Sequence, residues 1–217
     1  SLPVDADEQK KRILPVIAAL SRATRCPISV DTAVASVAAA ALDAGASIVN
    51  DVSALAADPE MLPLVSARGC PVVIMHMKGT PRTMQKAPCY RDLMGEITAF
   101  LRMAIDRAVE GGVSREQIVV DPGIGFGKTL QHNLEILQRL KEFSSLGRPI
   151  LVGPSRKAFI GKLTGEPVEN REFGSAAAIA LATQFGAHII RVHAVSQMKE
   201  AAVVADAIAQ GRPRGEL

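Results

Sequence analysis

A glycine-rich stretch that begins with a carboxylate and ends with an ammonium is the part of the sequence best suited to chemistry. Asp121–Lys128 reads DPGIGFGK and directly follows the apolar run Ile118–Val120. A β-branched run that ends in Asp-Pro-Gly predicts a buried strand that delivers a carboxylate to its C-terminal edge. Three glycines in five residues remove the Cβ atoms that would hold a ligand off the backbone, and Lys128 adds a cation where a helix begins. We therefore expect a ligand site here.

Two generic nucleotide motifs do not fit this stretch. The P-loop pattern GxxxxGK[ST] needs a glycine where Pro122 stands, and the GxGxxG fingerprint needs its third glycine where Lys128 stands. The alternative to a ligand site is a glycine-rich turn between strand and helix that binds nothing.

Polar residues at other predicted strand ends suggest two halves of one ligand. Asp31, Asn50 and Asp121 offer carboxylate and amide acceptors, which suit a planar heterocycle with an amino-amidine edge. A second set offers hydroxyl, guanidinium, ammonium and imidazole donors that suit an anion such as phosphate. This set is Ser155, Arg156, Lys157, Arg191 and His193. The expected site is bipolar, with a heterocycle at one side and a phosphate at the other.

Each of these residues also has an ordinary structural interpretation. Asp31 could be a helix cap, Arg191 and His193 could form an internal polar network, and Arg156 or Lys157 could be surface charges. Their joint placement at strand ends favours a site.

Strands and helices are expected to alternate along the whole chain. Strands are predicted over 26–32, 47–52, 71–77, 118–121, 149–153 and 188–195. Helices are predicted over 1–20 despite Pro15, and over 34–44, 59–68, 93–110, 132–143, 173–185 and 197–210. Lys78–Tyr90 has no apolar period, and we expect a long, mobile loop.

This alternation predicts an α/β fold with a parallel sheet. Of the doubly wound sheet and the (β/α)8 TIM barrel, the barrel is favoured because polar residues end all six strands. These are Asp31, Asn50, His76, Asp121, Ser155 with Lys157, and Arg191 with His193. The likeness of GASIVNDVS to GAHIIRVHAVS supports repeated units. About six βα units are present, so we expect two more before Ser1, and a single barrel domain over 1–217 that is incomplete at its N-terminus.

Composition narrows the class of protein. A chain of 217 residues with 48% hydrophobic content can bury one core. A net charge of +3, no Trp, one Tyr and six Phe argue against nucleic acid, and no long apolar span suggests a membrane. Three cysteines without CxxC spacing indicate a reducing, cytoplasmic setting. His132 and His188 are expected to be structural, and no cluster suggests a protein-bound transition metal.

Several motifs together resemble the dihydropteroate synthase family of pterin-binding enzymes. They are DPGIGFGK with His132 and Asn133 downstream, LVGPSRKAFIG from Leu151, MHMKGTPRTMQ from Met75, ISVDT, IVNDV, and RVH from Arg191. The resemblance covers essentially the whole chain. It implies a (β/α)8 barrel that joins a hydroxymethyl-dihydropterin diphosphate to p-aminobenzoate and releases pyrophosphate.

The resemblance also implies a role for each matching residue. Catalytic roles fall on Asp121, Lys157 and Asp31. Pterin contacts fall on Asp31, Asn50, Met75, Asp121 and Lys157. Diphosphate contacts fall on Asn50, Arg191 and His193. The p-aminobenzoate pocket is bordered by Gly125, Phe126, Ser155 and Lys157.

Further expectations come from the same resemblance. Mg²⁺ is the implied cofactor, with a family Asn ligand that has no counterpart in this chain. A homodimer is implied, and Lys78–Tyr90 matches the mobile region of the family. The family motif RVHDV reads RVHAV here, with Ala194 in place of Asp, and Ala33 and Val34 replace the usual residues after SVDT. A corrinoid-linked pterin methyltransferase is the enzyme alternative, but that class lacks the Ser-Arg-Lys motif. An inactive pterin-binding barrel fragment is the other alternative.

Overall fold

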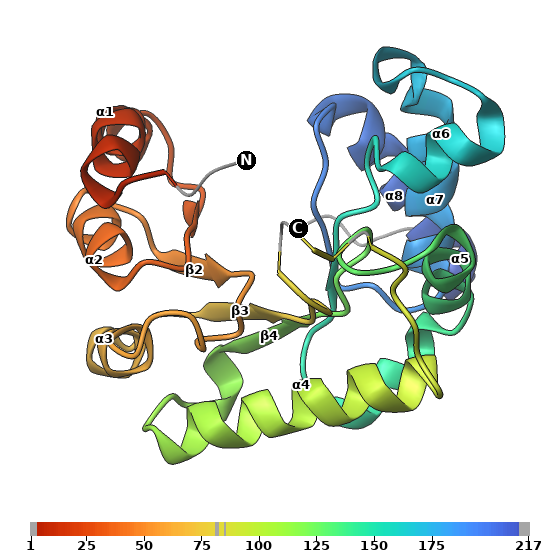
Figure 1. Ribbon diagram of the computed structural model, residues 1–217. Coiled ribbons are helices and arrows are strands. Elements are labelled where there is room, and N and C mark those ends of the chain that lie inside the picture. The colour runs from red at the N-terminus through yellow and green to blue at the C-terminus, as the bar shows by residue number, and fades with distance from the viewer. Residues whose placement is uncertain (1–3, 81–82, 85, 213–217) are drawn as a thin grey trace. The chain divides into compact units, whose positions relative to one another are not determined.

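The computed structural model describes residues 4–80, 83–84 and 86–212. Figure 1 shows strands alternating with helices along this chain. The first half holds α1 (Ala6–Ala23), β1 (Ser29–Asp31), α2 (Ala35–Asp43), β2 (Ile48–Asp51), α3 (Met61–Arg68), β3 (Val72–Met75) and α4 (Leu93–Glu110). The second half holds β4 (Ile118–Asp121), α5 (Leu130–Gln138), β5 (Leu151–Val152), α6 (Ala158–Thr164), α7 (Glu172–Gln184), β6 (Ile189–Ile190) and α8 (Val195–Gln210). Short 3-10 turns lie at Arg115–Gln117, Leu140–Leu146 and Val168–Asn170.

The chain divides into two compact units. One comprises the stretch up to His76 together with Ala99–Val120, and the other comprises Met77–Thr98 together with the stretch from Asp121 onward. The prediction of a single barrel domain over 1–217 stays a prediction. Each unit is described by itself.

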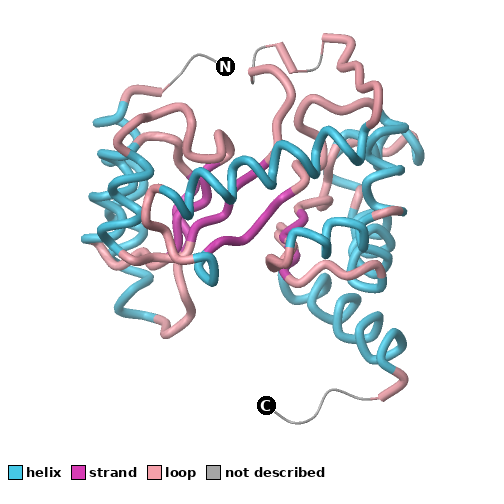
Figure 2. Tube along the Cα trace, turned by 90° about the horizontal axis from the view of Figure 1, so that it is seen from below, coloured by secondary structure: helices cyan, strands magenta, loops and turns pink. Residues whose placement is uncertain are grey.

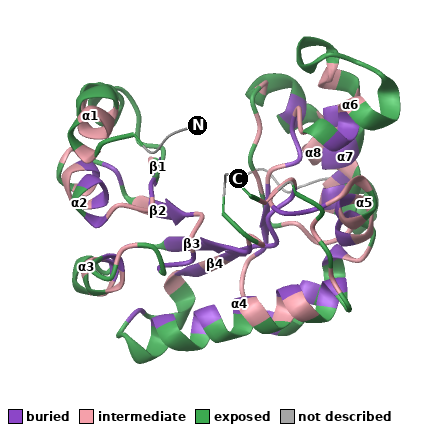
Figure 3. Cartoon of the chain, viewed as in Figure 1, coloured by how far each residue is buried: buried purple, intermediate pink, exposed green. Residues whose placement is uncertain are grey.

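The first unit is built on a parallel sheet with strand order β1-β2-β3-β4. Asp31 lies opposite Asn50, and Asn50 lies opposite Val73, so neighbouring strands end at one edge. All four residues of β3 are buried, as expected for a parallel strand covered on both faces. Figure 3 shows β3 as a buried segment, and β2 is buried from Val49 onward. The sheet therefore brings the ends of β1, β2 and β3 to one side.

Helix α1 shows how local sequence sets the first unit. Asp5 caps its N-terminus by accepting from the backbone N–H of Asp7 at 3.0 Å. The prediction of a helix that runs through Pro15 is confirmed, and Pro15 lies on an exposed side of the helix. The predicted bounds of α4 and β4 are also confirmed, at Leu93–Glu110 and Ile118–Asp121.

The second unit contains the parallel pair β5 and β6, with the α5–α8 helices. Figure 2 shows these short strands as magenta segments beside helices. Thr129 and His132 form a capping box at the start of α5, with Thr129 Oγ1 accepting from the His132 N–H at 3.2 Å. His188 Nδ1 accepts from the Ile150 N–H at 3.2 Å. Both histidines therefore have the structural roles that the sequence predicted.

The internal repeat seen in the sequence is present in the backbone. Gly45 and Gly186 both have positive φ, +111° and +96°, at the end of a helix. In each case the backbone N–H of the next residue donates to the carbonyl oxygen five positions earlier. Ala46 donates to Ala41 and Ala187 donates to Ala182, both at 2.9 Å. Two equivalent helix-to-strand junctions therefore support the reading of repeated βα units.

Several predicted boundaries were wrong. The last strand was predicted over 188–195 but comprises only Ile189–Ile190, so Arg191 and His193 lie in the loop that follows it. Helix α6 was missed, because its seven residues are too few to show a helical period. The helix predicted over 132–143 ends at Gln138 and is followed by a 3-10 turn.

The glycine-rich stretch lies tightly against the start of the 78–90 segment. Gly123, Gly125 and Gly127 all have positive φ, between +64° and +84°. A Cβ on Gly127 would lie 2.3 Å from the carbonyl oxygen of Lys78. The Gly127 carbonyl in turn accepts the hydroxyl of Tyr90 at 2.9 Å. Glycine at 127 is therefore required both by conformation and by space.

We predict that Gly127→Ala destabilises the protein far more than Gly147→Ala. Both glycines have φ of +64°, but nothing lies within 4 Å of a Cβ built at Gly147. The control should cost about 1 kcal/mol for the left-handed conformation, and Gly127→Ala about 2 kcal/mol more for the clash with backbone. Urea unfolding of both variants checks this, and equal losses would contradict the close contact.

Candidate functional site

Asp121 is the buried centre of the site in the second unit. It ends β4, is 9% exposed, and its Oδ1 accepts from the Gly123 N–H at 2.7 Å. Burial raises the pKa of this carboxyl to about 6, although the Gly123 hydrogen bond and the charges of Lys128, Lys157 and Arg191 oppose that rise. Asp121 is therefore a carboxylate withdrawn from water and surrounded by cations.

Lys128 lies at the other end of the glycine-rich stretch and is also buried. It is 3% exposed, and its Nζ donates to the carbonyl of Phe126 at 2.9 Å. Burial lowers the pKa of the Lys128 ammonium to about 7, and Lys157 acts in the same direction, whereas Asp121 raises it. The sequence placed this cation at a helix start but gave no sign that it is buried.

Lys157 faces the same stretch from the turn before α6. Its Nζ lies 4.3 Å from the centroid of the Phe126 ring, and a Cβ on Gly125 would lie 3.2 Å from its Cδ. The Gly125 N–H donates to Asn133 Oδ1 at 2.7 Å, which ties the turn to α5. Gly125, Phe126 and Lys157 are thus brought together as predicted, and Asn133 is a supporting residue that was not predicted.

Ser155 and His193 form a second polar pair in this unit. Ser155 Oγ lies 3.0 Å from His193 Nδ1, and Ser155 is 3% exposed whereas His193 is exposed. Arg191 is exposed, and its backbone N–H donates to Val152 at 2.9 Å. The loop after β6 therefore offers an imidazole and a guanidinium that can reach an anion.

The Arg156 guanidinium is paired with a carboxylate, contrary to the open anion contact that the sequence suggested. Its Nε donates to Glu172 Oε1 at 2.7 Å, and its backbone N–H donates to Ser175 Oγ at 2.9 Å. Its φ is +57°, a conformation unusual for a residue with a side chain. This guanidinium joins the turn before α6 to α7, so its role is structural.

The remaining predicted residues lie in the first unit. Asn50 Nδ2 donates to Asp31 Oδ2 at 3.3 Å, and Asn50 is 7% exposed. Met75 ends β3 and is 3% exposed. Asp51, the next residue after Asn50, accepts from the backbone N–H groups of Ser53 and Leu55, which fixes the turn after β2. Asp31 and Asn50 are thus brought together, as predicted.

The described residues of the 78–90 segment lie in no helix or strand, as predicted, and their ends are held in place. Lys78 Nζ donates to Glu96 Oε2 at 2.8 Å and lies 4.1 Å from the centroid of the Tyr90 ring. The Lys78 ammonium and the Arg91 N–H lower the pKa of Glu96 to about 2. Desolvation raises the pKa of Tyr90 well above its usual value. Mobility of this loop stays a prediction.

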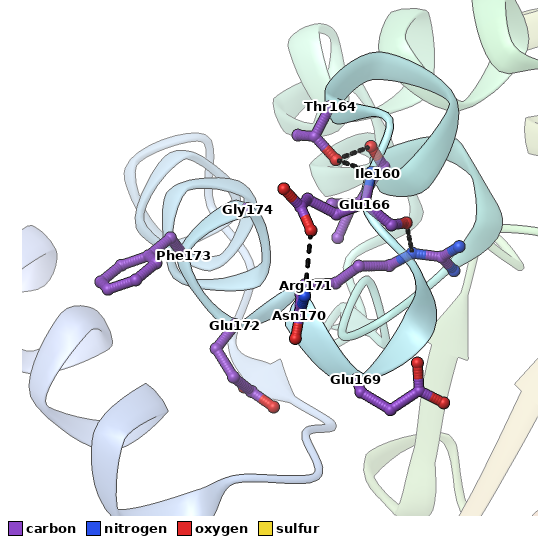
Figure 4. A pocket seen from close by; sticks show the side chains of 9 residues that line it. All are labelled: Ile160, Thr164, Glu166, Glu169, Asn170, Arg171, Glu172, Phe173 and Gly174. Carbon is purple, nitrogen blue, oxygen red and sulfur yellow. Dashed lines mark hydrogen bonds between the residues drawn. The ribbon is translucent and has the colours of Figure 1, made fainter.

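A separate hollow of about 580 Å³ lies between α6 and α7 (Figure 4). Its polar groups bond to one another: Arg171 Nε donates to the Glu166 carbonyl at 3.0 Å, and Asn170 Nδ2 donates to Glu166 Oε2 at 3.2 Å. Because these polar groups already have partners within the hollow, we do not interpret it as a ligand site.

No group of three His, Cys, Asp or Glu side chains within residues 4–80, 83–84 and 86–212 is placed to hold a metal ion. In the same ranges, no helix combines the length and the apolar content that a bilayer crossing requires.

The site combines a buried carboxylate, nearby cations and a glycine-rich strand end in an α/β fold. The family model "Pterin binding enzyme" matches residues 1–193. The chain belongs to this family.

The relatives are dihydropteroate synthases. That of Synechocystis is 44% identical over 206 residues, covering 94% of this chain and 71% of the relative. A Yersinia pestis dihydropteroate synthase with a sulfonamide drug matches with a TM-score of 0.94 at 39% identity, covering 96% of this chain and 76% of that one. A Xanthomonas albilineans dihydropteroate synthase in complex with 7,8-dihydropteroate matches with a TM-score of 0.90 at 41% identity, covering 97% and 77%. The predicted TIM-barrel fold class is confirmed.

We predict that Arg156→Gln lowers stability without weakening binding of pyrophosphate. The variant leaves the Glu172 carboxylate uncompensated, and Glu172 Oε2 is buried with no hydrogen-bond partner among the described residues. Because both side chains are about one-third exposed, the expected cost is about 1 kcal/mol.

Urea unfolding and calorimetric titration with pyrophosphate measure the two effects. The double variant Arg156→Gln/Glu172→Gln should recover most of the lost stability. If Arg156→Gln left the stability unchanged but bound pyrophosphate much more weakly, Arg156 would be a residue of the anion site after all.

Proposed function

We propose that this chain catalyses the dihydropteroate synthase reaction of folate biosynthesis. In this reaction the hydroxymethyl-dihydropterin diphosphate loses pyrophosphate, and its methylene carbon forms a bond to the nitrogen of p-aminobenzoate. The observation that carries the proposal is the buried Asp121, with the charges of Lys128, Lys157 and Arg191 acting on it. Membership in the pterin-binding family supports it.

The acceptor side of the site suits the pterin ring. Asp121 would accept N–H groups from the amino-amidine edge as a bidentate acceptor. On the family resemblance, Asp31 and Asn50 of the first unit, joined at 3.3 Å, are further proposed pterin contacts, and so is the buried Met75. A carboxylate withdrawn from water also stabilises the positive charge that develops on the methylene carbon as the C–O bond breaks.

The donor side suits the leaving diphosphate and the incoming amine. Arg191 and His193 would bind the diphosphate and stabilise its growing negative charge. Asn50 of the first unit is proposed as a further diphosphate contact on the family resemblance alone. Lys157 and Ser155 would border p-aminobenzoate together with Gly125 and the Phe126 ring. The neutral amine adds to the methylene carbon, the C–O bond to diphosphate breaks, and the proton that the amine nitrogen gives up passes to the released diphosphate. Charge placement and orientation are the chemistry these residues supply.

Mg²⁺ is proposed as the cofactor on the family resemblance alone. Mg²⁺ is commonly held by one or two carboxylates and by substrate phosphates, so it would arrive with the diphosphate. The described residues form no metal cluster of their own.

We also propose a cytoplasmic homodimer. Helices α7 and α8 line a groove of about 610 Å³. On them Leu181, Val204 and Ile208 are 53%, 58% and 69% exposed, which suits an apolar contact between copies. Cys26, Cys70 and Cys89 are free thiols, as in a reducing compartment.

The activity is tested by supplying the pterin diphosphate, p-aminobenzoate and Mg²⁺. The proposal expects pyrophosphate release that depends on p-aminobenzoate, with dihydropteroate as product. Pterin binding without turnover would favour the inactive binding barrel, and methyl transfer to a corrinoid would favour the methyltransferase. Either outcome would overturn the proposal.

We predict that Lys157→Ala lowers turnover at least ~10²-fold, the cost of one positioned charge in a site shielded from water. Lys162→Ala is the matched control, because Lys162 is an exposed lysine on α6 itself. Initial rates of dihydropteroate formation measure both variants. A Lys157→Ala rate close to that of the control would remove Lys157 from the site.

We further predict that p-aminobenzoate binds at least ~10-fold more tightly when pyrophosphate and Mg²⁺ are present, a coupling of about 1.4 kcal/mol. The physical reason is that the 78–90 segment adjoins the glycine-rich stretch, and an anion bound nearby would order it. Tyr90→Phe removes the hydrogen bond to the Gly127 carbonyl and should reduce the coupling. Calorimetry that finds equal affinities with and without pyrophosphate would refute this order of binding.

A further inference from the structure

Lys128 is a buried charge to which the mechanism above gives no task of its own. Lysine is among the residues least often buried, because removing an ammonium from water costs several kcal/mol by continuum estimates. Lys128 is nevertheless 3% exposed, in the second unit, one position before the N-cap of α5. With its pKa lowered to about 7, the amine still carries its charge at and below neutral pH, and a buried charge needs a reason beyond filling space.

The position of the ammonium is fixed by the turn itself. Lys128 Nζ donates to the Phe126 carbonyl at 2.9 Å, two residues back in the chain. Positive φ at Gly125 and Gly127 allows the backbone to turn so that this carbonyl meets the side chain. The same turn begins at Asp121, whose Oδ1 accepts from Gly123. One short stretch therefore holds both the buried carboxylate and the buried ammonium.

Charged groups on several elements shift the pKa values of Asp121 and Lys128. Lys128, Lys157 and Arg191 act on Asp121, from the glycine-rich stretch, the turn before α6 and the loop after β6 respectively. Asp121 raises the pKa of Lys128 and Lys157 lowers it. Lys128 in turn lowers the pKa of His132 in the first turn of α5. Among the cations around Asp121, Lys128 is the most deeply buried, so solvent screens it least.

We propose that Lys128 is a positioning residue: its buried ammonium, anchored on the Phe126 carbonyl, keeps Asp121 ionised so that the carboxylate can accept the amino-amidine edge of the pterin. The role rests on the proposed function. Lys157 and Arg191 lie closer to solvent and are engaged with substrate in the proposed reaction, whereas the Lys128 ammonium is buried and held on the Phe126 carbonyl at 2.9 Å.

The consequence for Asp121 follows from its raised pKa of about 6. The Lys128 charge lowers the pKa of Asp121, so without it this pKa should rise further, by about one unit or more. At neutral pH a large fraction of Asp121 would then be protonated, and a protonated carboxyl has one acceptor oxygen fewer for the pterin. Raising the pH would restore the carboxylate.

The test compares Lys128→Met and Lys128→Gln with Lys141→Met, an exposed lysine exchanged in the same way. The first readout is the ¹³C resonance of the Asp121 carboxyl in the free protein, assigned with Asp121→Asn. Wild type and the Lys141 variant should titrate near pH 6, and both Lys128 variants about one unit or more higher. If Lys128→Met fails to fold, Lys128→Gln, which keeps a polar group in the turn, carries the same comparison.

The second readout is the affinity for a hydroxymethylpterin without diphosphate. Both Lys128 variants should bind at least about twofold more weakly at neutral pH and approach wild type at about pH 9. Identical carboxyl titrations in all proteins would overturn the role of Lys128, even if the variants unfold more easily. Failure of the wild type to bind the pterin would instead count against the proposed function, because the titration of the free protein remains readable.

Discussion

The withdrawal of the Asp121 carboxylate from water is the constraint on which the second unit depends. A buried carboxylate without compensation would simply take up a proton. Here a backbone N–H and three cations partly offset burial, so that the pKa of Asp121 is raised only to about 6. The carboxylate is therefore ionised near neutral pH and still poorly solvated. Such a group binds a matching donor edge more strongly than a carboxylate exposed to water would.

The glycines make this arrangement possible. Positive φ at Gly123 places its N–H on Asp121, and positive φ at Gly125 and Gly127 turns the chain so that the Phe126 carbonyl meets Lys128. Gly127 also lets the backbone of Lys78 approach closely. The order of carboxylate, glycines and ammonium in the sequence is thus needed for these backbone contacts to form.

Much of this could be predicted from local sequence. The apolar run before Asp121 defined β4, and the strand ends placed Asp31 beside Asn50, because parallel strands end at one edge of a sheet. What failed depends on contacts distant in sequence or on short elements. Arg156 finds its partner sixteen positions on, at Glu172. The strand before Arg191 proved two residues long, since the polar residues that follow Ile190 lie in a loop. The burial of Lys128 is likewise decided by tertiary packing, which no local pattern reveals.

The central claim is that Asp121 binds the pterin as a buried carboxylate with a pKa of about 6. The most direct measurement is the affinity of the wild-type protein for a hydroxymethylpterin between about pH 5 and about pH 7.5, with Asp121→Asn measured alongside. The account predicts that wild-type affinity falls as the pH drops through about 6, approaching tenfold per unit below it, because the carboxylate is lost. The Asn variant should bind weakly and without this dependence. Wild-type affinity that is constant across the range would contradict the account.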